Sequence, residues 1–419
     1  MNPTSEIITI GDEILIGQTI DTNSAWIGER MSMIGLPVKR IISISDSPDE
    51  IRSALEESLG RADVVLITGG LGPTNDDRTK STLAGFFNSE LVEDHVVLED
   101  IQNLLKVRKV PVSLINRTQA LVPHNCRVLR NLQGTAPGMW FEKDGKVVIS
   151  MPGVPYEMIS IMETSVLRML ADFFRTPVIL HKTVMTTGVA ESRLAARLVG
   201  WESALPGNFS LAYLPSPGMV RLRISCSGDD RIELEKEMAE LTESLVDRVK
   251  DYFFGFDEIS LEEKVGQMLK ESRFTLSTAE SCTGGSIARL ITRIPGSSSY
   301  YKGGIVAYAN EIKMKYLDVT EKMLSQHGAV SQQVVEQMAS SCRFHFDADF
   351  SVATSGIAGP DGGTFDKPVG TTWIAVASRT GAVSQCFQFG EHRERNVVRA
   401  TLAALNMLRT EIMKETITT

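Results

Sequence analysis

The 419-residue chain is short of cysteine, of basic residues and of long apolar runs, and each shortage excludes a class of protein. Its five cysteines include no CxxC pair and are odd in number, so neither a zinc site nor a disulfide framework is expected. Asp and Glu total 52 against 43 Lys and Arg, which argues against the basic face of a nucleic-acid binder. No apolar run reaches the length of a membrane span, and residues 1–13 carry no leader-like pattern. We therefore expect a cytoplasmic protein that has neither a membrane nor nucleic acid as a partner.

The length and the pattern of the chain predict three domains. Residues 1–172 alternate apolar strands with helices, and the unbroken apolar run 63–68 is typical of a parallel strand buried on both faces. This pattern predicts a doubly wound, Rossmann-like α/β domain. Residues 173–256 predict a small α+β connector of KH-like type, without the GxxG loop that binds nucleic acid. Residues 257–419 predict a second α/β domain with glycine-rich loops at its strand ends.

Short motifs locate several element boundaries. Ser47, Pro48 and Glu50 predict a capping box with proline at the first helical position, and SLEE at 260–263 predicts a second capping box. Strands of the last domain are expected over 274–278, 304–308, 350–354 and 371–377.

Two strand ends in the first domain combine glycine with acidic residues: GDEIL at 11–15 and GGLGPTNDDRT at 69–79. Glycine lets the backbone approach a phosphate closely and exposes its N–H groups. The neighbouring Asp76 and Asp77 could hold a divalent cation that neutralises phosphate oxygens. Tight turns with solvated acidic caps are the alternative interpretation, but three glycines and two acids within eleven residues favour a site.

These two loops, together with MPGVP at 151–155, resemble the molybdopterin-binding domain family, in the version found at the N-terminus of the CinA family. The resemblance covers about residues 5–170 and implies a metal-dependent pyrophosphatase that cleaves ADP-ribose to AMP and ribose 5-phosphate, with Mg or Co as the metal. A pterin-handling role in molybdenum cofactor synthesis is the alternative that the same resemblance offers. The implied metal ligands are Asp76 and Asp77, and the implied nucleotide site consists of Gly11, Asp12, Glu13, Asp46, Gly69, Gly70, Gly72, Asp77 and Thr79.

The last domain carries AESCTGG at 279–285, between a predicted strand and a predicted helix. This placement exposes a nucleophile, and we expect backbone N–H groups of the turn 282–285 to stabilise an oxyanion. Ser281 needs a base, and no histidine has a clear claim, whereas Lys313 can serve if burial lowers its pKa. Cys282 is the alternative nucleophile on chemical grounds, because a thiolate at a helix N-terminus is activated.

The blocks AESCTGG, VAYANEIK, HGAVS, SGIAGPDGG and KPVGT are very similar to the CinA C-terminal domain, over about residues 260–413. The resemblance implies hydrolysis of nicotinamide mononucleotide to nicotinate mononucleotide and ammonia, in pyridine nucleotide recycling and without a cofactor. It implies that Ser281 is the nucleophile, that Lys313 is its base and that Tyr308 supports them. Arg395 is a second candidate for the substrate-binding arginine. The implied substrate-binding residues are Cys282, Thr283, Gly284, Gly285, Ser355, Gly356, Gly359 and Arg393.

The expected partners are therefore small nucleotides, nicotinamide mononucleotide and ADP-ribose. Because relatives of both end domains form oligomers, a homodimer or larger assembly is expected. The alternative interpretation is a nucleotide-binding scaffold linked to competence or DNA damage, with one or both domains catalytically silent.

Overall fold

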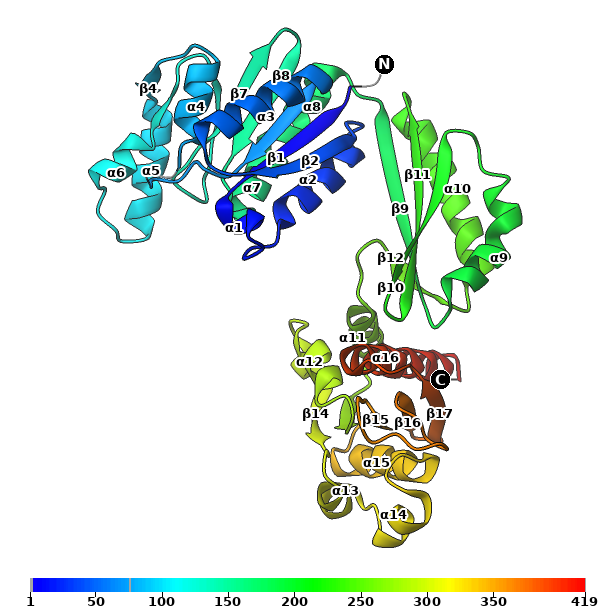
Figure 1. The fold of residues 1–419 in the computed structure, drawn as a ribbon. Helices are drawn as coiled ribbons and strands as arrows, with labels where there is room; N and C mark the ends of the chain where they lie inside the picture. The colour runs from blue at the N-terminus through cyan, green and yellow to red at the C-terminus, as the bar shows by residue number, and fades with distance from the viewer. Residues whose placement is uncertain (1–2, 75–76, 419) are drawn as a thin grey trace. The chain divides into compact units, whose positions relative to one another are not determined.

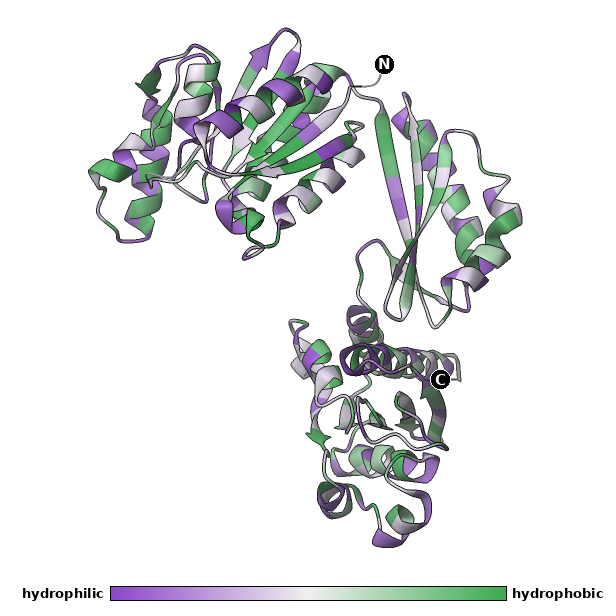
Figure 2. Ribbon diagram, viewed as in Figure 1, coloured by the Kyte–Doolittle hydropathy of each residue, from purple (hydrophilic) through white to green (hydrophobic). Residues whose placement is uncertain are grey.

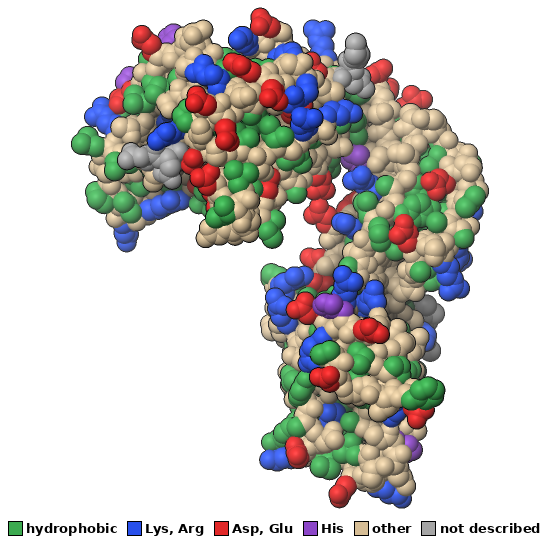
Figure 3. Space-filling view, viewed as in Figure 1, with side chains coloured by type: hydrophobic (Ala, Val, Ile, Leu, Met, Phe, Trp, Pro, Cys, Tyr) green, Lys and Arg blue, Asp and Glu red, His purple; other side chains and the backbone are tan. Residues whose placement is uncertain are grey.

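The computed structural model describes residues 3–74 and 77–418. The chain divides into two compact units, Met1–Leu180 with Ser227–Leu234 and His181–Cys226 with Glu235–Thr419 (Figure 1). None of the helices in the described ranges combines the length and apolar character needed to cross a membrane. On the face drawn in Figure 3, acidic and basic side chains are interspersed rather than gathered by sign.

The first domain is built on a six-stranded sheet in the order β2-β1-β3-β8-β7-β6. The four strands β2, β1, β3 and β8 are parallel, and β7 and β6 complete one edge antiparallel. The chain passes from β2 across β1 to β3, so the winding direction reverses between β1 and β3, which confirms a doubly wound domain. The strands are β1 Ser5–Ile10, β2 Val38–Ile44, β3 Val64–Thr68, β6 Arg127–Leu129, β7 Gly138–Lys143 and β8 Lys146–Met151.

Helices cover both faces of this sheet, and alternate residues of each strand supply the two cores. Ile7 of β1 packs in one core and Ile8 in the other, as the two-residue repeat of a strand requires. Figure 2 shows the central strands as hydrophobic ribbons between these helices. The remaining elements are α1 Asp12–Leu15, α2 Thr22–Met33, α3 Pro48–Arg61, α4 Thr79–Phe86, β4 Leu91–Glu93, α5 His95–Val107, α6 Leu114–Thr118, β5 Leu121–Pro123, α7 Pro155–Ile161, a π-helical turn Met162–Val166 and α8 Leu167–Phe174.

The capping box predicted at Ser47 is wrong, although Pro48 does open α3. The Ser47 side chain makes no capping bond, and the Glu50 carboxylate accepts a hydrogen bond from the Ser45 backbone N–H at 3.1 Å. The carboxylate reaches past the N-cap and satisfies a donor of the preceding loop instead.

The connector has a four-stranded antiparallel sheet in the order β10-β11-β9-β12 (Figure 1). Two helices cover one face of this sheet, so β11 alternates buried Val220, Leu222 and Ile224 with more exposed residues. Its elements are β9 Val178–Thr187, α9 Glu191–Glu202, β10 Phe209–Ser216, β11 Met219–Gly228, α10 Arg231–Val249 and β12 Phe253–Phe256.

The last domain has a five-stranded sheet in the order β14-β13-β15-β16-β17, with β14, β13 and β15 parallel. Helices α11, α12 and α16 cover one face, and α13, α14 and α15 cover the other (Figure 1). Its elements are α11 Leu261–Glu271, β13 Leu276–Glu280, α12 Ser286–Thr292, a 3₁₀ turn Ser297–Ser299, β14 Tyr301–Val306, α13 Asn310–Leu317, α14 Glu321–His327, α15 Gln332–His345, β15 Phe350–Gly356, β16 Thr371–Ser378, β17 Gly381–Gln388 and α16 Arg393–Thr418.

The boundaries predicted here are right for one helix and displaced for two strands. The capping box between Ser260 and Glu263 is confirmed at the start of α11. The strand predicted from Phe274 begins at Leu276, because the Phe274 N–H donates to the Leu269 carbonyl and closes α11. β14 ends at Val306, which leaves Tyr308 in the following loop.

Candidate active sites

The nucleophile candidate of the C-terminal domain lies where β13 turns sharply into α12. Ser281 directly follows β13, and its N–H donates to the Thr354 carbonyl of β15 at 3.0 Å. The Ser281 carbonyl accepts from the Gly284 N–H at 3.1 Å, which closes the turn. Gly284 and Gly285 have φ of +60° and +94°, a left-handed backbone that glycine adopts without strain. Ser281 is only 8 % exposed, so the turn presents it at the edge of the sheet rather than in open solvent.

A carboxylate that the sequence analysis did not identify holds this turn. Glu280 is fully buried, and its Oε2 accepts from Thr283 Oγ1 at 2.7 Å and from the backbone N–H of Gly285 at 3.0 Å and Ile287 at 3.1 Å. Its Oε1 accepts from the Ala288 N–H at 2.8 Å. These bonds satisfy donors that the start of a helix leaves without partners.

This arrangement changes the expected oxyanion donors. The Gly285 N–H is committed to Glu280 and the Gly284 N–H to Ser281, so neither is available to a substrate. Among the described residues, the turn is left with the N–H groups of Cys282 and Thr283.

The base candidate Lys313 is the fourth residue of α13 and only 2 % exposed. Its Nζ donates to the carbonyl oxygens of Ala307 at 2.8 Å and Tyr308 at 3.2 Å. Burial lowers the pKa of Lys313, and the charge of nearby Cys282 opposes that shift. Lys313 therefore lies within electrostatic reach of the Ser281 turn, while its hydrogen bonds in the described part of the chain go to carbonyls rather than to Ser281.

The geometry argues against Cys282 as the nucleophile. Burial raises the pKa of its thiol to about 11, with the Thr354 hydroxyl in hydrogen-bonding contact. A Cβ placed on Gly356 would lie 3.0 Å from the Cys282 sulfur, so the thiol is packed against the end of β15. The packing also explains Gly356, whose missing side chain makes room for its neighbours rather than for a ligand.

Three loops meet through Arg393 at the start of α16. Its Nη2 donates to the Tyr308 hydroxyl at 2.9 Å and its Nη1 to the Gly359 carbonyl at 2.8 Å. Tyr308 is 61 % exposed, so this cluster forms an accessible rim. Arg395 makes no such contact within the described ranges, which leaves Arg393 as the better placed arginine.

Two side chains fix the neighbouring loops. The Ser355 hydroxyl donates to the Ala329 carbonyl at 2.7 Å and is almost fully buried, so it ties two loops together instead of facing a ligand. Asn396, which the sequence analysis missed, donates to the carbonyls of Ala358 and Gly390 and anchors the glycine-rich loop after β15. An asparagine inside a helical pattern carries no sequence signal for such a role.

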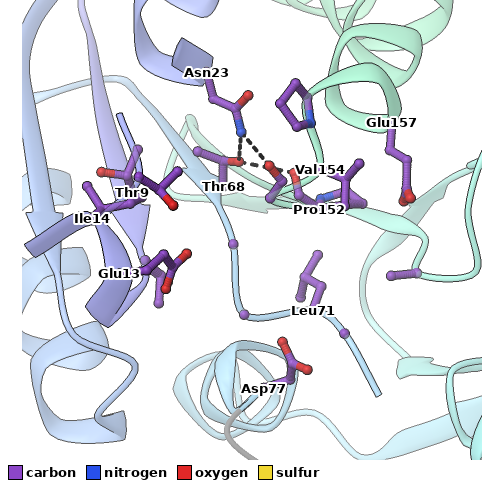
Figure 4. Close-up of a pocket in the computed structure, with 18 of the residues that line it drawn as sticks. Thr9, Glu13, Ile14, Asn23, Thr68, Leu71, Asp77, Pro152, Val154 and Glu157 are labelled. Atoms are coloured by element: carbon purple, nitrogen blue, oxygen red, sulfur yellow. Dashed lines mark hydrogen bonds between the residues drawn. The ribbon is translucent and has the colours of Figure 1, made fainter. Parts of the chain in front are cut away.

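The first domain has a cavity of about 540 Å³ at the carboxyl ends of β1, β3 and β8. It lies where the winding of the sheet reverses, which is the usual ligand position in open α/β sheets. Figure 4 shows Glu13, Asp77 and Glu157 around the loop that follows β3. The predicted residues that line the cavity are Glu13, Gly69, Gly70, Gly72 and Asp77.

Four other predicted residues do not line the cavity: Gly11, Asp12, Asp46 and Thr79. Thr79 is buried behind the loop, where its N–H donates to the Gly70 carbonyl and its hydroxyl to the Gly69 carbonyl, both at 3.2 Å. The metal-ligand candidate Asp76 lies outside the described residues. Its neighbour Asp77 accepts from the Thr74 N–H at 2.9 Å, which shapes the loop.

Several lining residues were not predicted from the sequence. Asn23 donates to Thr68 Oγ1 at 3.1 Å and to the Gly153 carbonyl at 2.8 Å, and so joins α2, β3 and the loop before α7 (Figure 4). Glu157 accepts from Asn131 Nδ2 at 2.7 Å, which aims its carboxylate. Glu157 follows MPGVP by two residues, and this proximity is the one signal that could have indicated it.

The charge of this cavity is one-sided. Its described lining includes the carboxylates of Glu13, Asp21, Asp77 and Glu157 and no Lys or Arg. Within residues 3–74 and 77–418, no group of three or more His, Cys, Asp and Glu is placed to hold a metal ion. A hard cation at this cavity would be held by one or two of these carboxylates together with ligand phosphates and water, as Mg²⁺ commonly is.

Comparisons with known proteins cover each domain. Family models match residues 6–172 ("Probable molybdopterin binding domain"), 181–255 ("Damage-inducible protein CinA KH domain") and 258–412 ("CinA C-terminal domain"). A CinA-like protein of Cytophaga hutchinsonii is 47 % identical over 408 residues, which cover 97 % of this chain and 98 % of that protein. A CinA-like protein of Flavobacterium psychrophilum is 46 % identical over 410 residues, with the same coverage.

A solved structure adds a further likeness. The competence/damage inducible protein CihA from Agrobacterium tumefaciens is 38 % identical to the matching part of this chain. The match covers 36 % of this chain and 92 % of that protein, with a TM-score of 0.35.

The burial of Cys282 yields a prediction about thiol reactivity. With a pKa of about 11, about 0.1 % of this thiol is ionised at pH 8. Iodoacetamide applied to the native protein at pH 8 should modify exposed Cys386 and spare Cys282 until the protein is denatured, as peptide mass spectrometry would show. Rapid native labelling of Cys282 would contradict the assignment and restore the thiol as a nucleophile.

Proposed function

The chain belongs to the CinA family, and on that premise we propose that its C-terminal domain is a serine amidase that converts nicotinamide mononucleotide to nicotinate mononucleotide and ammonia. The observation that carries the proposal is the burial of Lys313 beside the Ser281 turn, with a lowered pKa. A serine nucleophile without a histidine needs a lysine that gives up its proton readily, and burial lowers the pKa of Lys313 in that direction.

The two carbonyl partners of Lys313 suit a neutral amine. A neutral amine has two N–H groups and one lone pair, and the carbonyls of Ala307 and Tyr308 can take both N–H groups. The lone pair is then free to accept the Ser281 proton. An ammonium with three N–H groups would have one donor left, and this donor can go to the serine oxygen after the transfer.

The reaction follows an acyl-enzyme course. Ser281 gives its proton to Lys313, and its oxygen attacks the carboxamide carbon, so the carbonyl oxygen becomes an oxyanion. The N–H groups of Cys282 and Thr283 stabilise that charge. The protonated Lys313 returns the proton to the departing nitrogen, which leaves as ammonia. Water, deprotonated by Lys313, then hydrolyses the ester and frees the product and Ser281.

The rim formed by Tyr308, Gly359 and Arg393 binds the nucleotide portion. The partners of Arg393 are a hydroxyl and a carbonyl, so its full positive charge remains to pair with a phosphate. Recycling of pyridine nucleotides is the process in which such an amidase acts.

For the first domain we propose metal-dependent cleavage of a phosphoanhydride, with ADP-ribose as the substrate. The observation that favours it is the lining of four carboxylates without a described basic residue. A pyrophosphate would be repelled there unless a divalent cation came with it, and the cation supplies charge neutralisation to the phosphate oxygens. One or two of the carboxylates of Glu13, Asp77 and Glu157 would hold this cation, together with phosphate oxygens and water.

The amidase proposal predicts the effect of two substitutions. Ser281→Ala and Lys313→Met should each lower ammonia release from nicotinamide mononucleotide by about 10²–10⁴-fold, because nucleophile or base is lost. The assay measures ammonia in the presence of EDTA, with Cys386→Ala, an exposed cysteine outside the site, as the control that retains activity. A wild-type protein that releases no ammonia would contradict the amidase proposal and favour a catalytically silent scaffold.

The lowered pKa of Lys313 predicts the pH dependence of the amidase. The base is the neutral amine, so the rate should rise with pH as Lys313 loses its proton, with a midpoint below the ordinary value of 10.5. The measurement is kcat/KM against pH between 6 and the limit of stability. A rate that falls over this range, or a midpoint at the ordinary value, would contradict Lys313 as the base.

The charge of the first cavity predicts a separation of the two activities. EDTA should suppress ADP-ribose hydrolysis and leave ammonia release unchanged. Glu157→Gln should lower ADP-ribose hydrolysis alone, whereas Glu142→Gln, in the same domain but outside the cavity, should lower neither. Full ADP-ribose hydrolysis in EDTA, or equal loss in both variants, would argue against the cation and against Glu157.

A further inference from the structure

Glu280 is buried without a cation beside it. Its four hydrogen-bond donors are the Thr283 hydroxyl and the backbone N–H groups of Gly285, Ile287 and Ala288. No Lys or Arg among the described residues forms an ion pair with it. The carboxylate is therefore stabilised by the backbone of the turn and of the first residues of α12, and its hydrogen bonds in turn hold the conformation of the turn.

The carboxylate also sets the direction of a chain of hydroxyl groups. An ionised carboxylate only accepts, so Thr283 Oγ1 donates to Glu280. The Thr283 oxygen then accepts from the Thr354 hydroxyl at 2.8 Å. The Thr354 hydroxyl also contacts the Cys282 thiol. Thr283, which supplies one of the two proposed oxyanion donors, is thus fixed through a side chain that is bonded to Glu280.

We propose that Glu280 is the positioning residue of the amidase: it selects which N–H groups of the turn meet the substrate. The proposal deepens the proposed function and rests on it. By occupying the N–H groups of Gly285, Ile287 and Ala288, Glu280 keeps the start of α12 from competing for the substrate carbonyl or its phosphate. By holding the Thr283 side chain, it directs the Thr283 N–H toward the carbonyl oxygen of the substrate, where the oxyanion forms.

The test compares Glu280→Gln with a control carboxylate in the same domain. Glutamine keeps the shape but turns one acceptor into a donor that faces an N–H group. Asp349 accepts from the Thr275 N–H and hydroxyl at the opposite end of the sheet, so Asp349→Asn disturbs the domain without touching the turn. We expect Glu280→Gln to lower kcat by on the order of 10²-fold with little change in KM, and Asp349→Asn to lower only Tm.

A second pair of variants tests the link through Thr283. Thr283→Val removes the hydroxyl that donates to Glu280, and Thr283→Ser keeps it. Thr283→Val should lower kcat by about tenfold and Thr283→Ser should restore it, because a hydroxyl donor, not a methyl group, holds the turn. This pair decides the proposal if the Glu280 variants do not fold, since both retain the carboxylate.

A substrate-independent readout separates this proposal from the substrate assignment. A fluorophosphonate reacts with a serine whose oxyanion donors are in place, and peptide mass spectrometry identifies the modified residue. If wild type labels at Ser281 and Glu280→Gln does not, Glu280 positions the turn even when nicotinamide mononucleotide is not hydrolysed. Wild-type kcat and labelling in Glu280→Gln, equal losses in Asp349→Asn, or no labelling of wild type would overturn the proposal.

Discussion

The burial of two ionisable groups at one edge of the C-terminal sheet is the constraint on which the candidate amidase site depends. A charge removed from water is unfavourable unless it is hydrogen-bonded or neutralised. Glu280 meets this requirement with four donors, and hydrogen bonds to an ionised group contribute about 1.5–3 kcal/mol each. Lys313 has two carbonyl acceptors, and burial lowers its pKa, which favours the neutral amine. The proposed amidase depends on this combination of a hydrogen-bonded carboxylate and a lysine whose pKa is lowered.

The two end domains place their candidate sites at the same edge of their sheets, but the carboxylates of the two sites have different partners. Both candidate sites lie at the carboxyl ends of parallel strands, where glycine-rich loops leave the sheet. In the C-terminal domain the buried acid is satisfied by the protein's own N–H groups. In the first domain, Glu13, Asp77 and Glu157 face a cavity whose described lining includes no Lys or Arg, and we propose that a cation supplies the positive charge. This difference explains why one proposed reaction requires a metal ion and the other does not.

The sequence predicted features that depend on neighbours along the chain. Ser281 at a strand end, the capping box at Ser260 and the apolar strand β3 each depend on a local pattern, and the structure has all three. Glu280 was missed because its partners lie three to eight residues ahead and meet it only after the two glycines reverse the chain. The pairing of Glu157 with Asn131 spans 26 residues and leaves no local pattern. The hydrogen bond from the Ser355 hydroxyl to the Ala329 carbonyl is also a long-range contact. Ser355 matched a ligand-binding motif in the sequence, but in the structure its side chain joins two loops.

The measurement that tests the central claim most directly is the capture of the acyl-enzyme. Protein quenched in acid during turnover of nicotinamide mononucleotide is digested, and the peptide that contains Ser281 and Cys282 is sequenced by mass spectrometry. The account predicts an ester of nicotinate mononucleotide on the Ser281 oxygen. A thioester on Cys282, or ammonia release at the wild-type rate from a protein without the Ser281 hydroxyl, would contradict it.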